Sequence, residues 1–198
     1  MQEIISALSK YTWSDIGRMA YAFVLTKIFF RRARLVRRPI SIRGKRGLRY
    51  GKGFTTGRNC RFEVFGEGLI TFGDNCLIGD YVHIAADESV SLGHDCLLAS
   101  KIFISDISHG IYSGPDSQSD PEQPPNERDL HSDPVAIGNN VWIGDNVSIL
   151  GGVSIGDGCV IGSNAVVTKS IPAQCIAGGI PAKILKKYDK AAQQWVRV

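Results

Sequence analysis

The sequence predicts an all-β solenoid, in which short strands and turns coil repeatedly around one core. Three observations support this fold class. From Ile137 the chain reads IGNNVW, IGDNVS, ILGGVS, IGDGCV, IGSNAV and VTKSIP, so an aliphatic residue recurs every six positions. Turn-forming residues occupy the middle of each unit, where Gly and Asn supply the positive φ that tight bends require. One coil cannot bury its apolar positions alone, so the coils must stack.

The same six-residue frame occurs earlier in the chain, as YGKGFT, TGRNCR, FGDNCL, IGDYVH, IAAD(ES)VS, LGHDCL and LASKIF. Glu88 and Ser89 form a two-residue insertion in one of these units. An amphipathic helix would need apolar residues at a spacing of about 3.6, and a β-sandwich would have turn signals about every 8–12 residues. Neither pattern fits, so the solenoid is preferred.

These units resemble the hexapeptide-repeat acyltransferase family over residues 48–187. The resemblance implies a left-handed parallel β-helix with three units per coil, and the handedness follows from the resemblance alone. The C-terminal half is similar to galactoside and maltose acetyltransferases. The segments YVHIAA, SDISHG and IPAKILKKY, the last followed by QW, resemble bacterial lipopolysaccharide and O-antigen O-acetyltransferases.

The resemblance implies an O-acetyltransferase that moves acetyl from acetyl-CoA to a saccharide hydroxyl, in the synthesis of bacterial surface polysaccharide. An antibiotic, an amino sugar or another small molecule is the alternative acceptor. A zinc hydratase on the same scaffold would need three converging histidines, but His83, His94, His109 and His131 lie too far apart in sequence. A catalytically silent scaffold is disfavoured because the loop histidine and the donor-site sequence are retained. No metal and no nucleic-acid partner are expected, although the mild net charge of +4 by itself says little about partners.

Three regions are expected: a helical, basic arm over residues 1–40, the β-helix over 41–187 and a C-terminal tail or short helix over 188–198. The apolar run Met19–Phe30 is too short to span a bilayer. Five arginines follow this run (Arg31, Arg32, Arg34, Arg37 and Arg38). The arm therefore suits either an interfacial helix on an anionic membrane or a cap over the first coil. We expect a cytoplasmic protein with reduced thiols, in peripheral contact with the inner membrane if the first interpretation holds.

The last residue of each unit points outward, because it lies between two inward positions. One predicted outward column reads Leu77, Leu97, Trp142, Val160; a second reads His83, Phe103, Ser148, Val166; a third reads Ser91, Ala136, Ser154. The first column is too apolar to face water. It therefore favours the homotrimer implied by the resemblance, with donor sites between subunits. Cys60, Cys76, Cys96 and Cys159 stand at small apolar positions and are predicted to be buried.

A loop over residues 105–134, rich in Asp, Ser and Pro, interrupts the repeat and begins SDISHG. The resemblance places the catalytic histidine in such a loop, and by position it is His109. Imidazole titrates near neutrality and can remove the proton of an attacking hydroxyl. Asp106 could orient the ring, although a backbone carbonyl could do the same. Asp80, His83 and Asp87 are candidate acceptor contacts, and Asp87 matches an acceptor-contacting aspartate of the galactoside acetyltransferases.

The resemblance also implies the residues of the donor site. Trp142 would pack beside both donor and acceptor, and Asp145 stands at a position that contacts CoA. Ser163, Thr168 and Lys169 would meet the pantetheine and adenine parts, largely through backbone groups. Lys183 and Lys186 stand where the family places cations for the CoA phosphates, as point charges suit phosphate.

Overall fold

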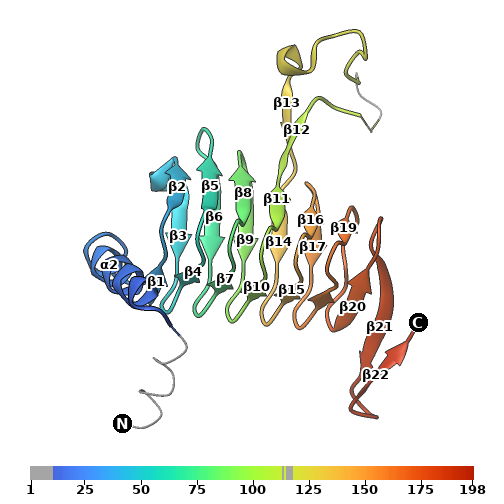
Figure 1. Cartoon of the computed structure of the whole chain (residues 1–198). Helices are drawn as coiled ribbons and strands as arrows, with labels where there is room; N and C mark the ends of the chain where they lie inside the picture. Colours follow the sequence, from blue (N-terminus) through green and yellow to red (C-terminus); the bar gives the residue numbers. More distant parts are fainter. Residues whose placement is uncertain (1–10, 113, 115–117) are drawn as a thin grey trace.

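The chain forms a parallel β-solenoid whose coils stack along a single axis (Figure 1). The computed structural model describes residues 11–112, 114 and 118–198. Each coil contributes one short strand to each of three parallel sheets, which are the three faces of the solenoid. The predicted all-β solenoid is therefore confirmed. Its body begins earlier than residue 41, since Leu35 and Val36 already pair with Thr55 and Thr56 of the next coil.

The first sheet, sheet A, consists of β1 (Leu35–Val36), β4 (Thr55–Thr56), β7 (Leu77–Ile78), β10 (Leu97–Leu98), β15 (Trp142–Ile143), β18 (Val160–Ile161) and β20 (Cys175–Gly178). Sheet B consists of β2 (Ile40–Arg43), β5 (Cys60–Val64), β8 (His83–Ala86), β11 (Phe103–Ser105), β16 (Ser148–Ile149) and β19 (Val166–Val167). Sheet C consists of β3 (Leu48–Tyr50), β6 (Leu69–Phe72), β9 (Ser89–Leu92), β14 (Val135–Ile137) and β17 (Ser154–Ile155). A 3-10 turn, η1 (Lys45–Gly47), joins β2 to β3.

The register of these sheets reproduces the three predicted outward columns. Along sheet A the paired residues are Leu77, Leu97, Trp142 and Val160. Along sheet B they are His83, Phe103, Ser148 and Val166, and along sheet C they are Ser91, Ala136 and Ser154. A regular period of six, with the loop removed, therefore fixes both the inward and the outward positions.

Apolar residues at the first and fifth positions of each unit fill the inside of the coils. The four cysteines predicted to be buried are at most 1% exposed, and Cys175 is also buried. Burial raises the pKa of the Cys60 thiol to about 11, so this thiol stays protonated at neutral pH. At the corners, Asn59, Asn75, Asn140, Asn146 and Asn164 have φ between 55° and 62°. The bends thus use the left-handed conformation that the sequence predicts.

Helix α2 (Trp13–Phe29) lies across the N-terminal end of the solenoid (Figure 1). Thr12 and Asp15 form a capping box that starts it. The side chains that α2 turns toward the first coil are small, and two of them, Ala22 and Thr26, are buried. The backbone N–H of Val36 donates a hydrogen bond to Thr26 Oγ1 at 2.8 Å. The helix therefore covers the first coil, as one of the two interpretations of the arm predicts. Residues 1–10 of the predicted arm lie outside the described residues. Within the described part, no helix is both long and apolar enough to cross a membrane.

The prediction of a short C-terminal helix is wrong. The chain instead forms two antiparallel strands, β21 (Lys183–Asp189) and β22 (Gln194–Arg197), which extend sheet A beyond β20. Side chains alternate between half-buried and exposed along β21, a period of two rather than 3.6. Tyr188 packs edge-on against Trp195, with ring centroids 5.3 Å apart. Pairing with the open edge of β20 explains why the segment is extended.

The inserted loop leaves the coil after β11 and returns at β14. Its stem is a ribbon of two antiparallel strands, β12 (Ile107–His109) and β13 (Leu130–Ser132), and a 3-10 turn, η2 (Pro125–Glu127), precedes β13. Figure 1 shows this ribbon projecting well beyond the coils. The loop therefore carries its residues away from the surface of its own solenoid.

Candidate active site

His109 is the last residue of β12, where its backbone pairs with Leu130 of β13. Its side chain is exposed, and its carbonyl oxygen accepts a hydrogen bond from the Tyr112 hydroxyl. Arg128 donates to the same hydroxyl at 2.7 Å, so the segment that follows His109 is tied to the turn that precedes β13. The predicted general base thus lies on the projecting ribbon, accessible to a ligand.

Asp106 lies at the base of the ribbon and is 1% exposed. Its carboxylate accepts three backbone N–H groups, from Asp87, Glu88 and Ser89, at 2.9, 2.9 and 2.7 Å. Within the described residues it makes no hydrogen bond with His109. Asp106 therefore does not orient the imidazole as suggested; it holds the two-residue insertion of the preceding coil against the start of the loop.

Asp87 lies beside this anchor and is half-buried. Its Oδ2 accepts a hydrogen bond from the hydroxyl of Ser132, on the returning strand of the ribbon, at 2.9 Å. The predicted acceptor contact is thus brought next to the base of the loop that carries His109. Asp87 and Asp106 together fix where the ribbon leaves the coil.

His83 lies on β8 in sheet B, one coil before the loop, with Phe103 in register beside it. The two rings pack with centroids 5.4 Å apart. The Nε2 of His83 lies 3.0 Å from the Oε2 of Glu63 on β5. Glu63 is 5% exposed and also pairs with Arg61 at 2.6 Å and Arg43 at 3.5 Å. His83 is therefore held by a buried carboxylate.

Glu63 was not identified from the sequence. Hydrogen bonds from Arg61 and then His83, with the charges of Arg61 and Arg43, lower the pKa of Glu63 and outweigh its burial. An available signal was the acidic residue inside the apolar run Phe62–Phe65, one coil before His83. Because this run does not follow the six-residue frame, the repeat assigns Glu63 neither an inward nor an outward position.

Asp80, Asp145 and Ser163 lie in one ladder along the corner that joins sheets A and B. Asp80 Oδ1 accepts the backbone N–H of Arg58 at 2.6 Å, and Asp145 Oδ1 accepts that of Ser100 at 2.9 Å. The hydroxyl of Ser163 in turn accepts the N–H of Asp145 at 3.1 Å. A Cβ on Gly57 would collide with Asp80, so glycine is required beneath this carboxylate. Each of these side chains therefore accepts a backbone hydrogen bond from the preceding coil, and this structural role is independent of any ligand.

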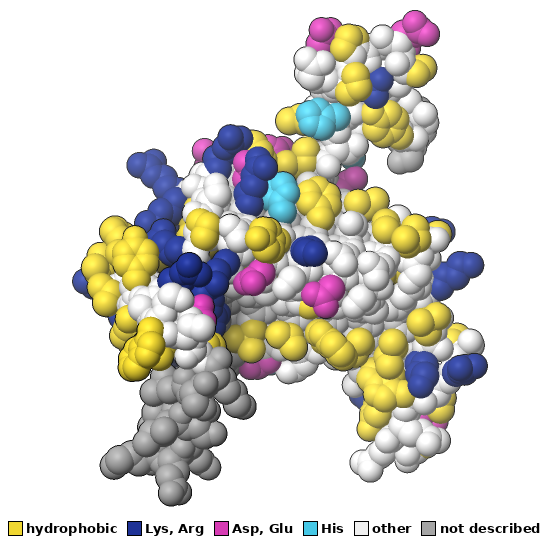
Figure 2. Space-filling view, viewed as in Figure 1, with side chains coloured by type: hydrophobic (Ala, Val, Ile, Leu, Met, Phe, Trp, Pro, Cys, Tyr) yellow, Lys and Arg dark blue, Asp and Glu magenta, His cyan; other side chains and the backbone are white. Residues whose placement is uncertain are grey.

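The outward residues of sheet A form an exposed apolar strip. Leu77, Leu97 and Trp142 are 37%, 45% and 52% exposed on successive coils. Figure 2 shows hydrophobic side chains in a line along the coils at this edge. Such a strip marks an interface or a ligand groove.

The remaining predicted donor residues gather toward the C-terminal end. Thr168 and Lys169 are exposed just after β19. Lys183 is exposed and Lys186 half-buried on β21. A β-bulge separates these two lysines: Lys183 pairs with Gly178 and Lys186 with Ile176 of β20, and Ile176 continues the outward column of sheet A. Because residues two apart on a strand face the same side, both lysines lie opposite the outward side of β20.

Each of three histidines has a carboxylate neighbour: His83 with Glu63, His94 with Asp95, and His131 with Asp133. These pairs lie on different elements, and the described residues contain no group of three or more side chains arranged to hold a metal ion.

The stacked six-residue coils make this chain a hexapeptide-repeat protein. A family model described as "Bacterial transferase hexapeptide (six repeats)" matches residues 134–169. A second, described as "Hexapeptide repeat of succinyl-transferase", matches residues 70–105. Both matches fall on the coils, one on each side of the inserted loop.

The chain is 43% identical over 192 residues to WbbJ of Escherichia coli (strain K12), an O-acetyl transferase assigned by name to lipopolysaccharide biosynthesis. The match covers 97% of this chain and 98% of WbbJ. The chain therefore belongs to the hexapeptide-repeat acyltransferase family, and the predicted membership is confirmed.

Two solved structures have the same fold. The polySia-specific acetyltransferase NeuO superimposes with a TM-score of 0.54 and 27% identity, covering 82% of this chain and 73% of NeuO. A mutant of AntD, an N-acyltransferase from Bacillus cereus solved with dTDP-4-amino-4,6-dideoxyglucose and coenzyme A, gives a TM-score of 0.69 at 21% identity. That match covers 85% of this chain and 90% of AntD, and at this identity it supports the fold alone.

Proposed function

We propose that this protein transfers the acetyl group of acetyl-CoA to a saccharide hydroxyl in the synthesis of bacterial surface polysaccharide. The observation that carries this proposal is the 43% identity to WbbJ over nearly the whole of both chains, arm and loop included. The exposed His109 on the projecting ribbon supports it, because a general base must reach the reacting hydroxyl.

The proposed reaction is a direct transfer. The acceptor hydroxyl oxygen attacks the thioester carbonyl carbon while His109 takes the hydroxyl proton. The tetrahedral intermediate then collapses, the carbon–sulfur bond breaks, and the leaving thiolate takes that proton from the imidazolium to give free CoA. Asp87 would contact the acceptor because it binds Ser132 of the ribbon, and His83 would do so because it lies beside Phe103 of β11, the strand from which the ribbon leaves. Asp106 acts only by anchoring the insertion turn.

A homotrimer completes this proposal. The strip Leu77–Leu97–Trp142 offers apolar area to a second subunit, and a ribbon that leaves its own coils can reach a neighbouring one. Trp142 and the exposed Thr168, Lys169 and Lys183 would then line a donor site between subunits, together with Asp145, Ser163 and Lys186.

We also propose that α2 rests on an anionic membrane surface. Away from the first coil it exposes the large apolar side chains Trp13, Phe23, Val24 and Ile28. Figure 2 shows basic side chains beside these hydrophobic ones at the α2 end of the solenoid. Apolar and basic groups on one helix favour an interfacial position. Covering the first coil and meeting a membrane are compatible, because they use opposite sides of α2.

The experiment that tests the proposed reaction is a thiol-release assay with acetyl-CoA and a panel of acceptors. The panel contains saccharide fragments, nucleotide sugars and amino sugars. Acetyl-CoA-dependent thiol release with a saccharide, giving an alkali-labile ester, is the expected result. Alkali-stable product formed only from amino sugars would instead support N-acetyl transfer.

A further inference from the structure

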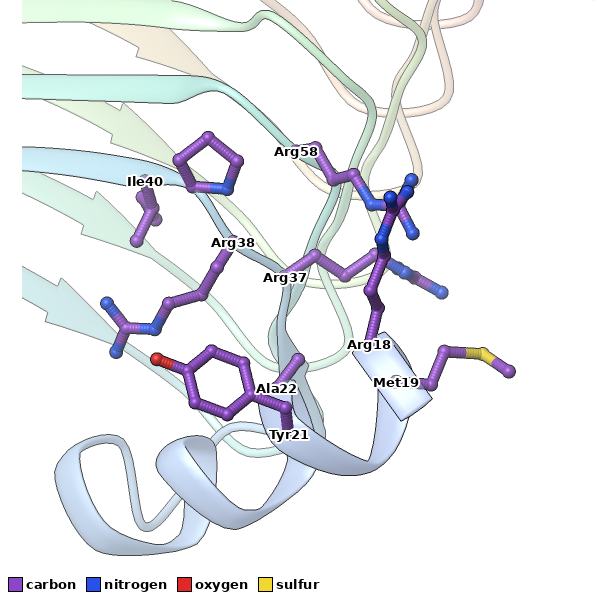
Figure 3. A pocket seen from close by; sticks show the side chains of 9 residues that line it. Arg18, Met19, Tyr21, Ala22, Arg37, Arg38, Ile40 and Arg58 are labelled. Carbon is purple, nitrogen blue, oxygen red and sulfur yellow. The ribbon is translucent and has the colours of Figure 1, made fainter. Parts of the chain in front are cut away.

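Four arginines line one pocket between α2 and the first coils. Arg18 comes from α2, Arg37 and Arg38 come from the chain entering β2, and Arg58 comes from the turn before β5. In Figure 3 the Arg18, Arg37 and Arg58 side chains extend to one side of the pocket, while Arg38 lies beside the Tyr21 ring on the other. The pocket has a volume of about 460 Å³, within the range of ordinary ligand sites.

These arginines carry more charge than the described residues around them neutralise. None of the four takes part in an ion pair with a described acidic residue. Arg37 donates to the carbonyl of Thr56 at 3.1 Å, and the Nε of Arg38 is buried without a hydrogen-bond partner within the described chain. Gathered like charges repel one another. An anion in the pocket would offset this repulsion.

Asp15 is the acidic side chain nearest to this cluster on α2. Its hydrogen bonds with Thr12, and to a smaller extent the charges of Arg18 and Arg58, lower its pKa. Asp15 is engaged in the capping box at the start of α2. It therefore leaves a net positive site.

A second hollow continues from this pocket along the corner ladder. It shares Met19, Arg37 and Arg58 with the first pocket and extends to Asp80 and Ser100. Carboxylate and hydroxyl groups suit sugar hydroxyls, while guanidinium groups suit phosphate oxygens. The two hollows together thus place a phosphate-binding end beside a sugar-binding end.

We propose that the arginine pocket binds the diphosphate of a carrier-linked saccharide, with the sugar lying toward Asp80 and Ser100. Naming the ligand as a saccharide rests on the proposed function, whereas anion binding by the four arginines does not. The carrier is a nucleoside or a lipid, since both linkages contain the same diphosphate.

Calorimetric titration of the full chain with pyrophosphate, without acetyl-CoA, tests the site independently of acetyl transfer. Saturable binding is expected, weakened at least about tenfold in Arg38→Gln, as loss of one charge-assisted hydrogen bond implies. Because Arg38 is partly buried, the double variant Arg18→Gln/Arg58→Gln provides a second test in which the folded core is untouched. The matched control is Arg34→Gln, which removes the same charge from an exposed position of the same basic run outside the pocket.

Two further titrations identify the carrier. Tighter binding of a nucleoside diphosphate than of pyrophosphate would support a nucleotide carrier. Arginine-dependent binding to vesicles that contain an isoprenyl diphosphate, stronger than binding to vesicles with the same content of phosphatidylglycerol, would support a lipid carrier. The proposal is overturned if pyrophosphate does not bind, or if Arg34→Gln weakens binding as much as the pocket variants do. Displacement of pyrophosphate by CoA in direct competition would also overturn it, because the pocket would then belong to the donor.

Discussion

His83 and Glu63 join two successive coils of sheet B through a contact of 3.0 Å between Nε2 and Oε2. The loop ribbon leaves the same sheet one coil later, after β11. Glu63 is thus a buried anion that three cationic or proton-donating side chains share.

Replacing Glu63 with Gln should reduce stability at neutral pH. Because the folded-state pKa of Glu63 is lowered, its carboxylate stabilises the fold above the ordinary carboxyl pKa. That contribution is lost as the pH falls through the lower folded value. The expected cost near pH 7 is about 1 kcal/mol, or roughly 2–4 °C in Tm.

Thermal unfolding at several pH values would measure this difference. The Tm gap between Glu63→Gln and the native protein should close as the pH falls below about 4. Glu67→Gln is the control, since it makes the same change at an exposed position on the next turn. A gap that is constant with pH would show that the ionisation of Glu63 does not stabilise the fold.

Replacing His109 with Ala should lower kcat by about 10²–10⁴-fold, the usual contribution of a general base. The KM for acetyl-CoA should change little, because the imidazole would act mainly in the transition state. His83→Ala should instead raise the KM for the acceptor. Normal kcat in His109→Ala with none in His83→Ala would assign the base to the His83–Glu63 pair.

The protein should be a trimer in solution, and Leu97→Asp should dissociate it. Leu97 is at the middle of the apolar strip on sheet A, where a charge would have to be buried between subunits. Ser154→Asp places the same charge on sheet C and should leave the trimer intact. Light scattering at micromolar concentration distinguishes these outcomes, and a monomeric native protein would remove the basis for a donor site between subunits.

The two lysines of β21 should act together on the donor. Lys183 and Lys186 pair with Gly178 and Ile176, which face the same side of β20, so both charges can meet the CoA phosphates. The double variant Lys183→Ala/Lys186→Ala should raise the KM for acetyl-CoA by about tenfold and change the KM for the acceptor little. Steady-state kinetics at saturating acceptor would test this. An unchanged KM for acetyl-CoA would mean that the lysines are only solvated.

Exposed residues of α2 should govern binding to vesicles. Trp13→Ser and Phe23→Ser together should weaken co-sedimentation with anionic vesicles, because both side chains point away from the coils. Point changes are preferable to deletion of the arm, since Phe30, Ala33 and Val36 belong to the core. Unchanged sedimentation would leave α2 as a cover for the first coil alone.

The repeat was sufficient to predict the fold because inward and outward positions alternate in a fixed frame. The same frame predicted the outward columns residue by residue, including Trp142 and His83. It could not predict the C-terminal hairpin, since Lys183–Asp189 lies beyond the regular units and its conformation depends on pairing with β20. A sequence of mixed Lys, Ile and Leu is compatible with either a helix or a strand when its partner is unknown.

The roles of the candidate residues were harder to predict than their positions. Asp80, Asp145 and Asp106 are conspicuous acids, yet each accepts backbone N–H groups of a neighbouring coil or turn. In a solenoid the partner of a side chain lies about one coil away in sequence. Glu63 and His83 are such a pair, and only the register of β5 with β8 brings them together.

The C-terminal segment also closes the growing end of the stack. Val166 of β19 donates to the carbonyl of Gly179 and accepts the N–H of Ala182, and β21 covers the free edge of β20. Ile171 exchanges hydrogen bonds with the strand β17 in sheet C. The edges of β19 and β20 are therefore covered by the same chain, and the last edge of sheet A is moved to β22, beyond the coils. An uncovered coil of this kind would be a template on which another molecule could add end to end, as in a cross-β fibre. The hairpin thus gives a repeating, open-ended architecture a finite length.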